Sequence, residues 1–105
     1  MIKLEGKINK IGDTEARGNP DKPFYKRIFW LSEVSENYPN FWQLELWQDD
    51  CKLIDNYKVG DFVTCYIDIK GQKWKKGDGT EVVMNSLKCW NFEKEGKSLK
   101  EIKAR

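Results

Sequence analysis

Tryptophan and lysine occur together in this sequence, and the combination indicates binding chemistry. Trp74 lies in a short segment with four lysines, Lys70, Lys73, Lys75 and Lys76. A nucleobase can stack on an aromatic ring, and each stacked base contributes about 1–3 kcal/mol. Lysine side chains attract phosphates, and this attraction weakens steeply as salt is added. The segment is therefore typical of a site that holds a single-stranded nucleic acid.

Two earlier stretches of alternating sequence supply further rings and cations. Residues 24–34 and 41–47 have the two-residue period of β-strands, in which successive side chains point to opposite faces. Both faces of these strands carry apolar residues, so one face is expected to line a core and the other to expose surplus rings. The expected stacking residues are Trp30, Trp74, Phe41 and Trp47. The expected phosphate contacts are Lys26, Arg27, Lys73, Lys75 and Lys76.

Histidine is absent, and this excludes several kinds of active site. A Ser-His-Asp or Cys-His nucleophile system needs an imidazole, and so does a histidine general base near pH 7. The cysteines, Cys51, Cys65 and Cys89, lack C-x-x-C spacing and are too few for an all-cysteine zinc site. We expect them to be reduced thiols, with Cys65 and Cys89 in the core.

Aspartates offer the remaining route to catalysis, through magnesium ligation. The candidates are Asp49, Asp50, Asp55 and Asp61. Asp49 and Asp50 occupy the expected cap of a short helix, and Asp61 belongs to a tight turn. Because local structure accounts for these residues, we expect no metal site, no cofactor and no enzymatic activity.

The composition indicates one small soluble domain. The chain has 105 residues, of which 34% are charged and 13% aromatic. This is too many large rings for a disordered chain, and no apolar run approaches the roughly 18 residues of a membrane span. The N-terminus lacks the apolar region of a signal peptide, so a cytoplasmic location is expected. The net charge of +2 conceals +3 over residues 1–30, −5 over residues 31–61 and +4 over residues 62–105.

Five strands and one short helix are predicted along the chain. The strands cover residues 2–8, 24–34, 41–47, 62–69 and 80–92. Between them we expect a polar loop at 12–23, a turn at 37–40, a helix at 49–57 capped by Asp49 or Asp50, and a tight turn at 59–61. Gly77-Asp78-Gly79 is a strong hairpin signal between the last two strands. The predicted domain covers residues 1–93, and residues 94–105 form a basic tail.

This order of elements predicts an all-β OB-fold, a five-stranded barrel with a short helix between strands 3 and 4. OB-folds bind oligonucleotides and oligosaccharides through the face of strands 2 and 3 and two flanking loops. An SH3-like barrel of similar size is the alternative. Within either barrel, Phe29, Trp42, Val63 and Ile67 are expected in the core.

Several segments resemble the DUF3127 family of bacterial and phage proteins. They are Tyr25–Phe29, Tyr38-Pro39, Leu44–Trp47, Val59–Asp61, Asp68–Trp74 and Leu87–Trp90. The resemblance covers roughly residues 2–93. It implies an OB-fold and a role like that of single-stranded-DNA-binding proteins.

Together, the residues and the resemblance predict a non-catalytic protein that binds single-stranded DNA with little sequence preference. Its expected setting is replication, recombination or repair in the cytoplasm of a bacterium or a phage-infected cell. The choice between DNA and RNA, and the formation of a homodimer, stay open. The alternative is a protein–protein interaction module that uses the exposed rings. Salt separates the two, because only nucleic-acid binding should weaken strongly as salt rises.

Overall fold

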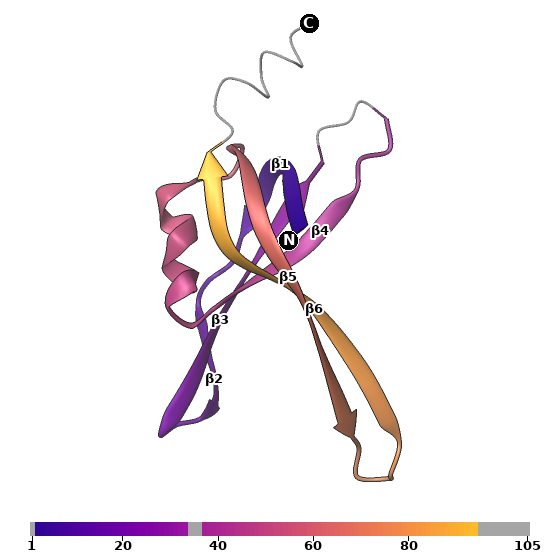
Figure 1. Cartoon of the computed structure of the whole chain (residues 1–105). Helices are drawn as coiled ribbons and strands as arrows, with labels where there is room; N and C mark the ends of the chain where they lie inside the picture. Colours follow the sequence, from indigo (N-terminus) through magenta and orange to yellow (C-terminus); the bar gives the residue numbers. More distant parts are fainter. Residues whose placement is uncertain (1, 34–36, 95–105) are drawn as a thin grey trace, which may run out of the picture.

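A barrel of strands with two projecting hairpins forms this molecule, and the two hairpins diverge from one end of the barrel (Figure 1). The computed structural model describes residues 2–33 and 37–94. Its elements are β1 (Ile2–Ile11), β2 (Glu15–Asn19), β3 (Lys22–Ser32), β4 (Phe41–Trp47), the 3₁₀-helix η1 (Gln48–Asn56), β5 (Phe62–Lys75) and β6 (Glu81–Lys94). No helix in this part of the chain is long and apolar enough to cross a membrane.

Strand β1 closes the barrel by pairing with two strands in turn. Its first half, Ile2–Lys7, pairs with β5, and its second half, Lys7–Ile11, pairs with β3. Gly6 lies where β1 passes from one partner to the other, and a Cβ there would come within 2.1 Å of the Ser32 carbonyl oxygen. Only glycine permits this close approach of the two backbones.

The order of the strands around the barrel is that of an OB-fold. Each strand pairs antiparallel with its neighbours, in the order β1-β5-β6-β4-β3, except for one parallel contact between β4 and β6 at Glu45 and Lys88. With η1 between β4 and β5, this arrangement confirms the predicted fold class.

The core fills the inside of the barrel and includes residues from every barrel strand and from η1. Its members are Ile8, Phe29, Leu31, Leu44, Leu46, Cys51, Ile54, Val63, Cys65, Ile67, Cys89 and Phe92. The predictions for Phe29, Val63 and Ile67 are therefore confirmed. Trp42 is half-buried and packs against this core.

The buried cysteines are thiols, as expected. The neighbouring Cys89 side chain and burial raise the pKa of Cys65, and burial raises the pKa of Cys51. Because the thiolate is the reactive form, these raised pKa values make both side chains poor nucleophiles.

The predicted helix is present, but its predicted cap is wrong. The residue that precedes η1 is Trp47, and no side chain caps the helix. The backbone turns at Gln48, whose φ is 55°, and η1 therefore starts before either aspartate. Asp49 and Asp50 lie in its first turn instead, where a negative charge interacts favourably with the helix dipole.

Two segments are more regular than the sequence indicates. The predicted loop at residues 12–23 contains β2, which pairs with β3 from Glu15 and Lys26 to Asn19 and Lys22. Strand β5 was expected to end at residue 69 but continues to Lys75, paired with β6. The β2–β3 and β5–β6 hairpins are therefore long arms rather than loops. Of the predicted basic tail, all residues after Lys94 lie outside the described part of the chain.

Candidate nucleic-acid interface

The exposed face predicted for the two strands exists as a continuous strip on β3 and β4. These strands pair from Lys26 and Trp47 at one end to Ser32 and Phe41 at the other. Alternation places every second side chain on the outside of the barrel. We call the resulting set the outer strip; it consists of Phe24, Lys26, Ile28, Trp30, Phe41, Gln43, Glu45 and Trp47.

One end of the outer strip opens into a groove between the two arms. The groove has a volume of about 320 Å³, and its lining comes from β2, β3, β4, β5 and β6. The lining residues are Arg17, Phe24, Lys26, Trp47, Lys70, Gln72, Trp74, Met84 and Ser86. Three of these nine residues are aromatic, three are cationic and none is acidic. The groove thus combines the two kinds of group that hold a single strand.

Trp47, which lines the groove, has three contacts that hold its ring. Its indole Nε1–H donates a hydrogen bond to Glu45 Oε1 over 2.8 Å. The edge of its ring meets Phe24, with ring centroids 5.4 Å apart and planes at 72°, and Lys88 Nζ lies 5.3 Å from the ring centroid. These contacts fix the orientation of the ring before any ligand binds.

Trp74 projects from the β5–β6 arm on the other side of the groove. It pairs with Val82 across the arm, and it is 55% exposed. Lys70 and Gln72 lie on the same face of β5, because residues two apart in a strand point the same way. Trp47 from β4 and Trp74 from β5 therefore line the same groove.

The three lysines near Trp74 that were predicted to contact phosphates lie outside the lining of the groove. Lys73 and Lys75 alternate to the opposite face of the arm, where Lys73 pairs with Glu81 at 3.4 Å. Lys76 begins the turn at the tip of the arm, where its backbone N–H donates to the Thr80 carbonyl. In their place, the groove contains Lys70 and Arg17. The two-residue period of the sequence, extended to residue 75, is the signal that would have selected Lys70 over Lys73.

Arg27 points away from the outer strip, although Lys26 beside it belongs to the strip. Its guanidinium donates to the carbonyl oxygens of Gly12 and Cys51, at 2.7 and 3.1 Å. It also forms an ion pair with Asp55 at 2.8 Å. These contacts tie η1 and the end of β1 to β3, and they occupy the guanidinium that was predicted to contact a phosphate.

The other two expected stacking residues lie at the far end of the outer strip. Trp30 is four residues from Lys26, which is about 13 Å along a strand. Its Nε1–H donates to Gln43 Oε1 over 3.3 Å, and Lys10 Nζ lies 4.5 Å from the centroid of its ring. Phe41 is 64% exposed and borders a separate apolar hollow with Trp30, Trp42 and Gln43. The structure thus divides the four predicted rings into two pairs.

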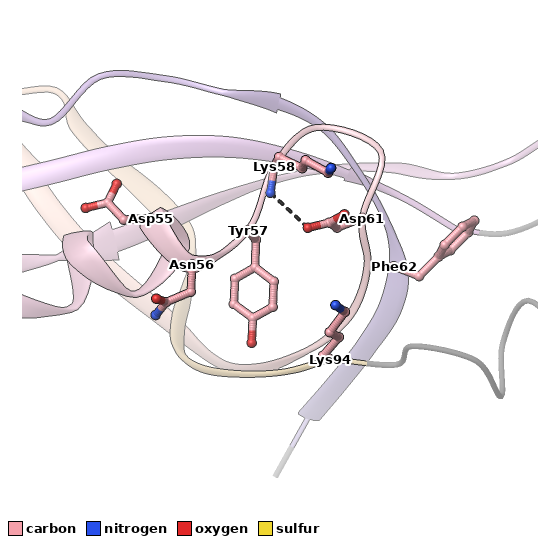
Figure 2. Close-up of a pocket in the computed structure, with 7 residues that line it drawn as sticks. All are labelled: Asp55, Asn56, Tyr57, Lys58, Asp61, Phe62 and Lys94. Carbon is pink, nitrogen blue, oxygen red and sulfur yellow. Dashed lines mark hydrogen bonds between the residues drawn. The ribbon is translucent and has the colours of Figure 1, made fainter.

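A larger cavity, of about 610 Å³, lies between the end of η1, the following turn and the ends of β5 and β6 (Figure 2). Its lining residues are Asp55, Asn56, Tyr57, Lys58, Asp61, Phe62 and Lys94. Asp61 accepts a hydrogen bond from the Lys58 backbone N–H at 3.0 Å, and Asp55 is the partner of Arg27. Burial raises the pKa of Tyr57, so its hydroxyl stays protonated. Two acids and two lysines line this cavity, so it lacks the cationic character of the groove.

The described residues contain no cluster of three or more His, Cys, Asp or Glu side chains arranged to hold a metal ion.

The fold and the groove define an OB-fold protein with an aromatic, cationic cleft between two arms. Residues 3–93 match the family described as "Domain of unknown function (DUF3127)", and the chain belongs to this family. The resemblance seen in the sequence is therefore confirmed. No curated protein matches the sequence.

Among solved structures, the chain is similar to the crystal structure of Rim1, a mitochondrial single-stranded DNA binding protein from S. cerevisiae. The two sequences are 12% identical, and the TM-score is 0.59. The match covers 90% of this chain and 92% of Rim1. At this low identity, the similarity supports the fold.

Proposed function

We propose that this protein binds single-stranded DNA in the groove between its arms, without catalysing a reaction. The observation that carries the proposal is the lining of the groove, with three rings, three cations and no acid among its nine residues. Bases would stack on Trp47 and Trp74, while Arg17, Lys26 and Lys70 would neutralise phosphates. The similarity of the fold to Rim1 supports this use of the barrel.

The proposed binding has little sequence preference, because every base has a face that can stack on a ring. Such a protein would act on strands exposed during replication, recombination or repair. We propose the cytoplasm of a bacterium or of a phage-infected cell as its setting.

The far end of the outer strip favours a second candidate function, interaction with a protein. Phe41 is largely exposed there, and the hollow beside it is lined by Trp30, Phe41, Trp42 and Gln43, with no cation among them. An exposed apolar hollow of this kind suits a protein partner or a second copy better than a phosphate backbone.

A fluorescence titration tests the proposed function. Trp47 and Trp74 line the groove, so poly(dT) should quench tryptophan emission at low salt, and the affinity should fall steeply at higher salt. Absence of quenching at low salt would overturn the proposal. Poly(rU) in a parallel titration reports the preference between DNA and RNA. Binding that ignores salt would favour the protein-interaction module.

Removal of one ring locates the site. We expect Trp74→Ala to weaken binding of fluorescently labelled (dT)20 by about 1–3 kcal/mol, the value of one stacked base. The melting temperature should barely change, because the ring is more than half exposed. Trp30→Ala is the matched control at the far end of the outer strip and should have the smaller effect on anisotropy titrations. An equal loss for both variants would contradict a site centred on the groove.

A further inference from the structure

Glu45 is the only acidic residue of the outer strip, and it lies beside Lys26, one of the three cations that line the groove. Its side chain is only 12% exposed. Two groups share its Oε1 atom: the indole Nε1–H of Trp47 at 2.8 Å and the ammonium of Lys26 at 3.1 Å. The carboxylate therefore contacts both a stacking ring and a phosphate-binding cation of the proposed interface.

The two contacts have opposite consequences for ligand binding. The hydrogen bond to Trp47 favours the binding of a base, because it holds the ring in place before the base arrives. The ion pair opposes phosphate binding, because the Glu45 carboxylate already neutralises Lys26 and repels a phosphate that approaches it. The Lys26 side chain is only 24% exposed and the Glu45 side chain 12%, so the pair is partly shielded from water. In a partly desolvated position such a pair is stronger than at the open surface.

We propose that Glu45 acts as an internal competitor for the phosphate backbone, limiting affinity in the groove while it positions Trp47. The proposal rests on the proposed function and adds a means of restraint to the same site. Lys26 then contributes to DNA binding only the difference between a phosphate and a carboxylate partner. Single-stranded DNA is therefore expected to bind less tightly, and to dissociate more readily, than the number of cations in the groove implies.

Glu45→Gln separates the two roles of this residue. The glutamine carbonyl oxygen can still accept the hydrogen bond from Trp47, but it carries no charge to hold Lys26. We expect (dT)20 to bind about three- to fivefold more tightly at low salt, because Lys26 is no longer neutralised by the Glu45 carboxylate. We also expect the slope of log K against log salt to steepen by about 0.7, because one more phosphate is neutralised on a single strand.

Glu81→Gln is the matched control, because it also removes one carboxylate from a lysine partner. That pair lies on the face of the arm turned away from the groove, so the salt slope should not change. An equal gain for Glu81→Gln would show a general effect of net charge and overturn the proposal. Unchanged or weaker binding by Glu45→Gln, with an unchanged slope, would also overturn it.

A double variant keeps the test decisive if Glu45→Gln alone does not fold. Glu45→Gln combined with Lys26→Met leaves no unpaired charge in the outer strip. If Glu45 already neutralises Lys26, the double variant should keep nearly the salt slope of the natural protein. A slope lower by the full value of about 0.7 would show that Lys26 is an unrestrained contact, against the proposal. Failure of the natural protein to bind (dT)20 would instead count against the proposed function.

Discussion

Strands β5 and β6 build two regions of the molecule that differ in kind. Inside the barrel, Val63, Cys65 and Ile67 are fully or almost fully buried. Two residues beyond Ile67, on the same alternation, Ile69 is 59% exposed. Beyond this point the strands continue as the arm that carries Trp74 (Figure 1).

The difference arises from neighbouring strands rather than from the alternation itself. Strand β1 pairs with β5 between residues 62 and 67, and among residues 2–33 and 37–94 no strand flanks β5 farther out on that side. A bulge lies at the same point: Trp90 is left between the pairs Tyr66–Asn91 and Ile67–Cys89. Bulges bend and twist a strand, and this one lies where the arm leaves the barrel. The barrel thus contains the core, and the arm is a two-stranded ribbon that carries Trp74, a residue of the proposed interface.

The sharpest test of this comparison truncates one isoleucine on each side of the boundary, which is the point between Ile67 and Ile69 where the arm leaves the barrel. Ile67→Ala should lower the free energy of unfolding by about 2–5 kcal/mol, because it leaves a cavity in the core. Ile69→Ala should change it by no more than about 0.5 kcal/mol, because the side chain packs against little. Urea denaturation followed by circular dichroism measures both values.

Similar losses for the two variants would contradict the boundary. They would show that the arm is covered in solution, by a second copy or by other parts of the chain. Analytical ultracentrifugation of Ile69→Ala and of the natural protein would then separate these two causes.

The same boundary explains which parts of the fold were predictable from sequence. The barrel strands and the Gly77–Gly79 hairpin have strong local signals, because alternation and turn residues act over a few positions. Strand β2 has no such signal, since all five of its residues are exposed and it pairs through its backbone alone. The point after Ile67 at which β5 leaves the barrel has no local signal either, because it depends on the length of β1, a strand that is distant in the sequence.

The site was predictable to the extent that it lies on strands of known period. Trp47, Trp74 and Lys26 were selected by residue type, and the structure brings them into one groove. Arg17 and Met84 could not be selected, because only the approach of the two arms brings them together. The lysines around Trp74 were selected by proximity in sequence, which ignores the alternation that turns Lys73 away.

Two cations test the division between barrel and arm with a smaller expected effect. Arg27→Met should lower the free energy of unfolding by about 1–3 kcal/mol, because the carbonyl oxygens of Gly12 and Cys51 lose their donor. Its affinity for (dT)20 should stay unchanged wherever the protein is folded. Lys70→Met should leave stability unchanged and reduce the salt slope of binding by about 0.7.

Thermal unfolding measures the stability of both variants, and anisotropy titrations at several salt concentrations measure their salt slopes. A reduced salt slope for Arg27→Met, with its stability intact, would return that residue to the interface. A stability loss for Lys70→Met would show that the arm contributes to the fold.

The smallest expected effect concerns the tip of the arm, where Asp78 holds the turn. Its carboxylate accepts a hydrogen bond from the Thr80 backbone N–H at 2.8 Å, and Gly79 has a φ of 91°, which suits glycine. The hydrogen bonds from Thr80 lower the pKa of Asp78 below its usual value. A carboxyl whose pKa is lowered by folding stabilises the turn above its unfolded pKa of about 3.9. That contribution is lost as the pH falls through the lowered value.

We therefore expect the Thr80 amide resonance to shift as the pH falls below about 4, while core resonances such as that of Ile67 stay in place. Asp78→Asn keeps an acceptor oxygen for Thr80, so the turn should remain and this titration should disappear. Asp78→Ala removes the acceptor, and it should speed hydrogen exchange at the tip without lowering the melting temperature of the barrel. If Asp78→Ala lowered that melting temperature as much as Ile67→Ala does, the arm and the barrel would unfold as one unit. The contrast between a barrel that holds the core and an arm that folds independently of it would then fail.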